Sequence, residues 1–255
     1  MAFGAAVNRD GHTDRLRLNV YQPPASDTRV FRPAAVCIAG GGFRTGDRNK
    51  GETNTWAKHL ASRGFVAITI DYRLERPPRG QEPQNSSGTT VDWNRDAAHD
   101  AKAAVRWLVK HSQEYRVSTD HIVAFGSSAG GMMVAWLTAV RGDGEGSSGN
   151  PGFPSNITAG ISLSGFLLPT EYSQVTRAGQ TPYLDFHGTA DTTVPLAAAE
   201  ATHAEFVAKH DPAALIEIPG AAHTPWDAME QRSDDFFGFL TTYARLGELQ
   251  CPEKV

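Results

Sequence analysis

A serine between two glycines carries the clearest chemistry in this sequence. It is Ser128, in the pattern G-x-S-x-G of "VAFGSSAGG" (123–131). A serine hydroxyl held on a sharp turn can attack a carbonyl carbon once a base takes its proton. The pattern alone is weak, because glycine and serine are common turn residues, and Ser127 is a rival hydroxyl. The apolar run before the turn and the helical pattern after it favour Ser128 as a nucleophile.

The base that such a serine needs is expected among the nine histidines. His223, in "GAAHTPW", follows the last expected strand, so it should lie at the same end of the sheet as Ser128. His187 ends a strand and is interpreted as a packed neighbour of the site. The remaining histidines lie in segments with helical patterns, in the N-terminal tail or at a strand start: His12, His59, His99, His111, His121, His203 and His210. We therefore predict His223 as the base.

A carboxylate must fix the tautomer of that base and stabilise its protonated form. Asp191, in "FHGTADTTVP", follows the expected strand "PYLDF". Asp185 is the rival, but it lies within that strand. The chain order Ser128, Asp191, His223 is typical of one class of catalytic triad.

Attack on a carbonyl also creates an oxyanion, which fixed donors must stabilise. The glycine-rich stretch "AGGGF" (39–43) follows the first buried strand. Its backbone can turn N–H groups toward the site without a side chain in the way, so Gly41 and Gly42 are candidate donors. The backbone N–H of Ala129, at the start of the helix behind Ser128, is the third candidate.

The elements that must position these residues alternate along the chain. Apolar strand patterns cover 16–21, 34–40, 65–72, 121–126, 157–165, 182–188 and 214–220. Helical patterns cover 53–64, 92–111, 129–140, 195–210 and 227–246. Buried strands alternating with helices predict one doubly wound, mostly parallel sheet flanked by helices, in a single domain over 1–255.

Composition limits the remaining classes of function. The chain has 255 residues, 40% hydrophobic and 20% charged, with a formal net charge of −4. No basic run points to nucleic acid and no apolar stretch approaches a membrane span. Cys37 and Cys251 are too few for a disulfide framework. The first residues lack a basic start followed by an apolar core, so no signal peptide is expected, and a cytoplasmic or a secreted location stays open. Asp96, His99 and Asp100 share a helix face, but without further ligands we expect no metal.

Seven motifs together resemble the α/β-hydrolase fold serine esterases of the carboxylesterase and lipase branch. They are "LNVYQPP", "AAVCIAGGGFRTGD", "FVAITIDYRL", "DAKAAVRWLVKH", "VAFGSSAGG", "HGTADTTVP" and "GAAHTPW", in family order. The resemblance implies Ser128, Asp191 and His223 as the triad, Gly41, Gly42 and Ala129 as oxyanion donors, and no cofactor. One departure is Ala39, where the family usually has a histidine that helps to shape the glycine loop.

The resemblance also raises the question of the substrate. The segment 166–181 is too short for a helical lid, so little or no cap is expected, with the loop at 76–90 and "GFLLP" as partial walls. Phe43, Tyr72, Phe166 and Trp226 are expected to line the pocket. An open site suits short-chain or aromatic esters, including acetyl or feruloyl groups on a polysaccharide. A hydrolase-like binding protein without activity, and a peptidase or thioesterase with the same triad, remain alternatives. The sequence does not determine the oligomeric state.

Overall fold

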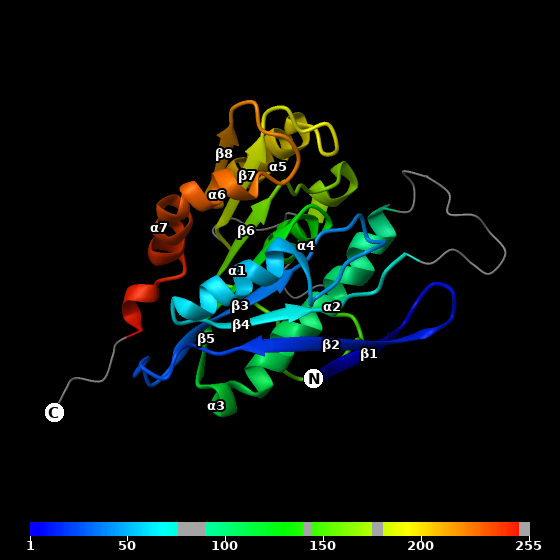
Figure 1. Ribbon diagram of the computed structural model, residues 1–255. Helices are drawn as coiled ribbons and strands as arrows, with labels where there is room; N and C mark the ends of the chain where they lie inside the picture. The colour runs from blue at the N-terminus through cyan, green and yellow to red at the C-terminus, as the bar shows by residue number, and fades with distance from the viewer. Residues whose placement is uncertain (76–89, 140–143, 175–180, 250–255) are drawn as a thin grey trace.

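The computed structural model describes residues 1–75, 90–139, 144–174 and 181–249, arranged around one eight-stranded sheet (Figure 1). The strands lie in the order β1-β2-β4-β3-β5-β6-β7-β8. They are β1 (Ala2–Val7), β2 (Thr13–Tyr21), β3 (Arg32–Ile38), β4 (Val66–Ile70), β5 (Val117–Ser127), β6 (Ala159–Leu163), β7 (Tyr183–Gly188) and β8 (Ala213–Ile218). The helices are α1 (Gly51–Ser62), α2 (Thr90–Lys110), α3 (Ser112–Tyr115), α4 (Ala129–Ala139), α5 (Leu196–Ala208), α6 (Trp226–Gln231) and α7 (Ser233–Tyr243), with 3₁₀ helices η1 (Pro169–Gln174) and η2 (Leu246–Glu248).

The sheet is mostly parallel, which confirms the predicted fold class. Strands β4, β3, β5, β6, β7 and β8 pair in parallel, and β2 pairs antiparallel with β4 and with β1. Strand β1 was missed by the sequence analysis, which treated this segment as a tail. Its residues, "AFGAAV", are mostly small and give little apolar contrast, so its pairing with β2 defines it.

Helices cover both faces of the sheet (Figure 1). Each face has its own apolar core. Along β3, Ala34, Val36 and Ile38 pack on one face with α2 and α4, while Ala35 and Cys37 pack on the other with α1 and α7. Because successive side chains of a strand point to opposite faces, a strand covered on both sides must be apolar throughout. This explains why the central strands read as unbroken apolar runs.

One element prediction needs correction. The helix predicted over 227–246 is two helices, α6 and α7, which meet at Arg232. In the loop after α4, Ser148 is buried, and its hydroxyl donates to the carboxylate of Asp100 at 2.6 Å. Arg73 also bonds this buried carboxylate. A buried charge needs such partners, so they pull this part of the loop inward.

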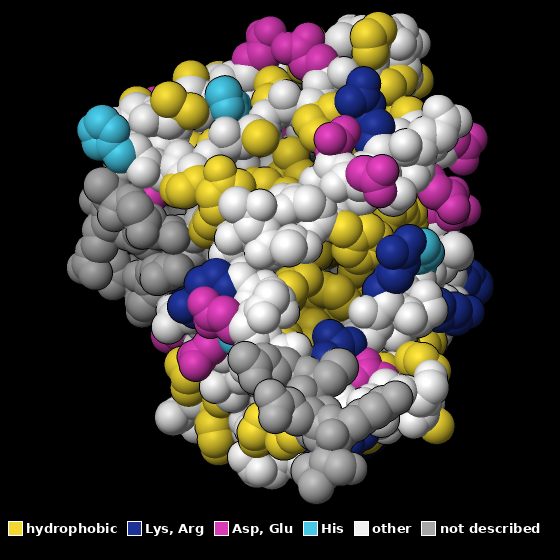
Figure 2. Space-filling model, turned by 90° about the vertical axis from the view of Figure 1, so that its left-hand side faces the viewer, with side chains coloured by type: hydrophobic (Ala, Val, Ile, Leu, Met, Phe, Trp, Pro, Cys, Tyr) yellow, Lys and Arg dark blue, Asp and Glu magenta, His cyan; other side chains and the backbone are white. Residues whose placement is uncertain are grey.

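The described chain between β6 and β7 contains η1, while residues 175–180 lie outside the described part. The same holds for residues 76–89 of the loop that was expected to form a wall, and for Cys251. No helix within the described residues is long and apolar enough to cross a membrane. Figure 2 shows positive and negative side chains next to each other on one face of the molecule.

Candidate active site

Ser128 occupies the turn between β5 and α4. Its φ of 53° is unusual for a residue with a side chain, and its N–H donates to the Leu163 carbonyl at 2.8 Å. Gly126 and Gly130 are required by close packing: a Cβ on Gly126 would collide with the backbone of Gly130, and one on Gly130 with the Ile38 carbonyl. The strand, the turn and the helix therefore press together and hold the serine in a strained conformation.

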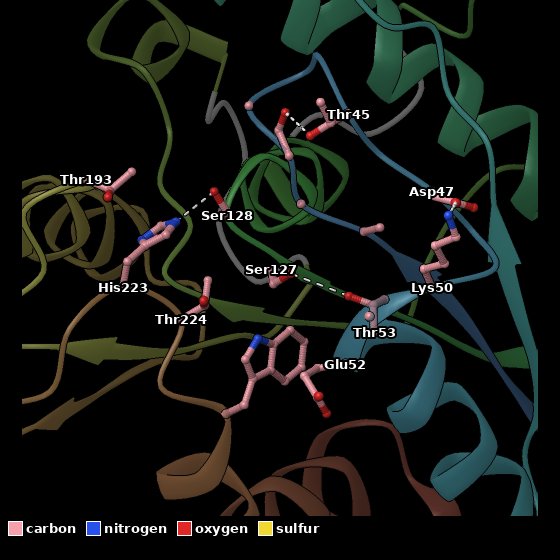
Figure 3. A pocket seen from close by; sticks show the side chains of 16 residues that line it. Thr45, Asp47, Lys50, Glu52, Thr53, Ser127, Ser128, Thr193, His223 and Thr224 are labelled. Carbon is pink, nitrogen blue, oxygen red and sulfur yellow. Dashed lines mark hydrogen bonds and ion pairs between the residues drawn. The ribbon is translucent and has the colours of Figure 1, made fainter.

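The side chains of Ser128, His223 and Asp191 form one chain of hydrogen bonds. His223 Nε2 lies 2.9 Å from Ser128 Oγ, and His223 Nδ1 lies 2.7 Å from Asp191 Oδ2. Figure 3 shows the imidazole of His223 facing the Ser128 hydroxyl. The Asp191 side chain is fully buried, while that of His223 is 23% exposed. The structure thus brings together the three residues that the sequence analysis singled out, while their catalytic roles stay a prediction.

Two neighbouring loops bring Asp191 and His223 together. The N–H groups of Thr189 and Ala190, after β7, donate to the carbonyls of Ile218 and Ala221, at and after the end of β8. Since β7 and β8 are parallel neighbours, their carboxyl ends meet at one edge of the sheet. Residues from both loops can therefore touch across that edge.

Ser164 is a positioning residue that the sequence analysis missed. It is buried directly after β6, and its hydroxyl accepts the Thr224 N–H at 3.0 Å. Ser164 and Thr224 both have positive φ, 57° and 51°. This contact fixes the loop next to His223. The available signal was its place at the end of a buried strand in "ISLSG".

The Asp191 carboxylate is held in its ionised form. Its Oδ1 accepts the backbone N–H groups of Thr193 and Val194 at 2.8 and 2.9 Å. Burial alone would raise the pKa of Asp191, but these two N–H groups and the hydrogen bond from His223 outweigh it and lower the pKa. An ionised Asp191 accepts a hydrogen bond from the N–H at Nδ1 of His223, so Nε2 carries no proton and can accept one from Ser128.

The glycine-rich loop passes directly beside the nucleophile. A Cβ on Gly40 would lie 3.1 Å from the Cβ of Ser128, and Gly41 and Gly42 have positive φ of 129° and 58°. Gly41 and Gly42 line the same cavity as Ser128. Ala129 is the first residue of α4, so its N–H has no partner within the helix. Gly41 and Gly42 therefore share the cavity of Ser128, and Ala129 adjoins Ser128 in the chain. Their role as oxyanion donors remains a prediction.

Tyr72, which follows β4, supports the glycine-rich loop, a role that the sequence analysis did not predict. It was expected to line the pocket, but it is buried, and its hydroxyl donates to the Ala39 carbonyl at 2.9 Å. Burial raises the pKa of Tyr72, so the hydroxyl keeps its proton and remains a donor. This bond supports the loop at Ala39, the position where the family usually has a histidine.

An open cavity of about 660 Å³ lies in front of Ser128. Figure 3 shows the polar side chains around it, including Thr53, whose hydroxyl lies 3.4 Å from that of Ser127. The lining consists of Ala39, Gly40, Gly41, Gly42, Thr45, Asp47, Lys50, Gly51, Glu52, Thr53, Ser127, Ser128, Thr193, His223, Thr224 and Trp226. The polar residues from 45 to 53 were missed, because they lie in a loop and a helix start without a catalytic pattern.

Of the four aromatic residues expected in the pocket, the structure places one in the lining. Trp226, at the start of α6, lines the cavity. Phe43 is 4% exposed and packs edge-on against Tyr72 in the core, and Phe166 packs partly buried against the same core. Phe43 is therefore a core residue, and neither Phe43 nor Phe166 lines this cavity. Being next to a catalytic motif in sequence does not decide which way a side chain points.

The rival residues have partners of their own. Asp185 Oδ2 lies 3.0 Å from His187 Nδ1, while the partner of His223 is Asp191. Asp100 is bound by Arg73 and Ser148. Within the described residues, no three His, Cys, Asp or Glu side chains are grouped so that they could hold a metal ion.

Comparison with known proteins shows to which family this chain belongs. The sequence matches the BD-FAE family over residues 18–155 and the phospholipase/carboxylesterase family over residues 90–239. The chain belongs to the α/β-hydrolase serine esterases. Solved structures agree with this: esterase 2 of Thermogutta terrifontis, phosphorylated by paraoxon, is 28% identical, with a TM-score of 0.72 over 94% of both chains. The same esterase phosphonylated by cyclosarin is 27% identical, with a TM-score of 0.74 over 95% of this chain and 92% of the other.

Two curated relatives of this chain are named as an esterase and an ester hydrolase. Ethyl acetate hydrolase of Pseudomonas putida is 31% identical over 51% of this chain and 36% of its own. Esterase LipI of Mycobacterium tuberculosis is 28% identical over 49% of this chain and 35% of its own. The chain spans about a third of the length of these relatives.

Proposed function

We propose that this α/β-hydrolase hydrolyses carboxylic esters through an acyl-enzyme on Ser128. The observation that carries the proposal is the continuous hydrogen-bond chain from Ser128 Oγ through His223 to Asp191, at 2.9 and 2.7 Å. In such a chain the histidine can take the serine proton as the hydroxyl attacks, while the carboxylate stabilises the imidazolium that forms.

The reaction follows from this arrangement in two halves. Ser128 Oγ bonds to the ester carbonyl carbon, and its proton moves to His223 Nε2. The oxyanion that forms accepts hydrogen bonds from the N–H groups of Gly41, Gly42 and Ala129. The carbonyl then re-forms, the bond between its carbon and the alcohol oxygen breaks, and His223 gives its proton to that oxygen. In the second half, water attacks the acyl-enzyme, His223 takes the proton of that water, and Ser128 regains it as the acid leaves.

For the substrate, we propose short-chain or aromatic acyl groups, including those attached to a polysaccharide. The cavity is open and lined mainly by glycine, threonine and charged side chains, with Trp226 at one side. Such a lining suits a small acyl group joined to a polar alcohol. The name ethyl acetate hydrolase and a T. terrifontis esterase 2 structure with bound propionate, 26% identical, support a small acyl group.

The test combines a covalent probe with a substrate panel. Paraoxon should phosphorylate the wild-type protein once, at Ser128, as found by mass spectrometry of its peptides. Ser128→Ala should take up none and should lose activity on the order of 10⁶-fold in kcat, and Ser127→Ala should still be labelled. Near-normal turnover by a folded Ser128→Ala variant would refute the mechanism.

The panel separates the alternatives. It includes p-nitrophenyl acetate, methyl ferulate, acetylated xylan, an acyl thioester and an aminoacyl amide. We expect the esters to be hydrolysed much faster than the thioester and the amide. A protein that is neither labelled by paraoxon nor active on any of them would be a binding protein with a hydrolase fold.

A further inference from the structure

A second aspartate–histidine pair lies behind the acid of the triad. His187 Nδ1 is 3.0 Å from Asp185 Oδ2, and both side chains are buried, 0% and 2% exposed. His187 Nε2 is 2.9 Å from the Val194 carbonyl oxygen. The same nitrogen is 3.6 Å from Asp191 Oδ2, the oxygen that accepts the hydrogen bond of His223. The pair thus lies next to the acid of the triad.

The contacts of the His187 ring determine where its protons lie. The Val194 carbonyl can only accept, so His187 Nε2 must carry a proton. One further proton lies between His187 Nδ1 and Asp185. The Gly165 N–H donates to Asp185 Oδ1 at 3.3 Å and favours the ionised carboxylate. That second proton then belongs to Nδ1, and His187 is an imidazolium.

The surrounding charges agree with this assignment. Burial raises the pKa of Asp185, but both of its carboxyl oxygens accept hydrogen bonds, and its hydrogen bond and charge raise the pKa of His187 against the burial of that ring. The titratable groups around the pair are Asp191 in the loop after β7, Tyr183 on β7 and, beyond Asp191, His223 in the loop after β8. A cationic His187 therefore faces a second carboxylate, that of Asp191.

We propose that Asp185 and His187 form a positioning pair for the ester-hydrolase site, which holds a positive charge behind Asp191 and thereby keeps His223 unprotonated at lower pH. The proposal rests on the proposed function of Ser128, Asp191 and His223. His187 is outside the cavity lining, so it acts through Asp191 and not on the substrate. Its hydrogen bond to Val194 also anchors the turn whose N–H groups bind Asp191.

The physical reason is the balance of charge at His223. A negative Asp191 favours the protonated imidazole, which cannot take the serine proton. A positive charge behind Asp191 offsets part of this attraction. Without that charge, His223 would take up a proton more readily, and the loss of activity in acid would begin at higher pH.

The test compares variants that remove the charge with one that does not. His187→Gln replaces the ring with a neutral side chain that can donate to Val194, and Asp185→Asn leaves His187 without its counter-charge. Tyr183→Phe is the control, since it changes a buried side chain on the same strand without changing a charge. For each, kcat/KM for p-nitrophenyl acetate is measured against pH, with circular dichroism to check the fold.

In both charge-removing variants the acid limb should move upward by about 0.5 to 1 pH unit, while the plateau falls less than about tenfold. The Tyr183→Phe limb should not move. A purely structural role would lower the plateau and leave the limb in place. An unmoved limb in both folded charge-removing variants would overturn the proposal.

A second measurement does not depend on activity or on folding of the variants. Nitrogen-15 NMR of the wild-type protein labelled at histidine should show protons on both ring nitrogens of His187 at neutral pH. A single ring proton would overturn the proposal even if no variant folds. If the wild type hydrolyses no ester, the proposed function fails, whereas this signal still reports the charge of the pair.

Discussion

Two contacts of His223 decide what Ser128 can do. Nδ1 faces the buried, ionised Asp191, so it carries the proton, and Nε2 is left to accept the proton of the serine. Asp191 is in turn fixed by the N–H groups of Thr193 and Val194. The orientation of the base therefore depends on one carboxylate in one turn.

Replacing this carboxylate should have a large and specific effect. We expect Asp191→Asn to lower kcat on the order of 10⁴-fold, because the amide favours the wrong tautomer of His223. Asp185→Asn should lower the plateau less than about tenfold, since Asp185 contacts His187 and not His223. Both are measured with p-nitrophenyl acetate after a check of the fold. If the Asp185 variant is the more damaged one, the roles are reversed.

Activity should fall in acid through a single protonation. The pKa of Asp191 is lowered, so this carboxylate stays ionised throughout the range near pH 6.5 in which histidines commonly titrate. Protonation of His223 is then the event that stops catalysis, and activity is lost as the pH falls. A plot of kcat/KM against pH measures this. A profile that stays flat down to about pH 4 would exclude His223 as the base.

At the scale of elements, the turn between β5 and α4 depends on close packing. Gly130 approaches the Ile38 carbonyl at the end of β3, and Gly126 approaches the Gly130 backbone. A methyl group at either position would push α4 away from the sheet. Because Ser128 is joined directly to α4, such a shift would also move the nucleophile relative to His223.

Two glycine-to-alanine changes in helices should therefore have opposite effects. Gly130→Ala should lower the free energy of unfolding by about 1–3 kcal/mol and reduce kcat, because the core is overpacked. A Cβ at Gly238, in α7, would have no atom within 4 Å. Gly238→Ala should therefore raise the free energy of unfolding by up to about 1 kcal/mol. Urea denaturation measures both. If both changes had the same effect on the free energy of unfolding, the close packing at Gly130 would not be important for stability.

At the scale of the whole molecule, the sheet brings together site residues from segments that are distant in the sequence. Ser128 follows β5, Ser164 follows β6, Asp191 follows β7 and His223 follows β8. These strands are parallel, so their carboxyl ends lie at one edge. The loop after β3 and the start of α1 add the remaining walls of the open cavity.

This cavity should favour short acyl chains. Each buried methylene contributes about 0.8 kcal/mol, but Trp226 provides the one large apolar surface in the described lining, so the gain should stop after a few carbons. We expect kcat/KM for p-nitrophenyl esters to be highest for acetate or butyrate and lower for octanoate and palmitate. A steady rise to palmitate would reveal an apolar groove for long chains.

Much of the fold and of the candidate site could be predicted from local patterns in the sequence. The unbroken apolar runs of β3 and β5 predict strands covered on both sides, and the turn at Ser128 has its own sequence pattern. Such signals lie within a few residues of each other, so the sequence alone determined the fold class and the three residues proposed for catalysis. It could not detect β1, whose small residues are defined by pairing with β2.

The tertiary structure decided what depends on contacts between distant segments. Phe43 lies in the core, whereas Trp226 lines the cavity. His187 pairs with Asp185, and His223 pairs with Asp191. Ser164 binds the backbone of the loop that carries His223. The physical reason is that a side chain's partner is set by the packing of whole strands and helices. Residues that lie two positions apart, such as Asp185 and His187, can meet each other, while Asp191 finds its partner 32 residues away.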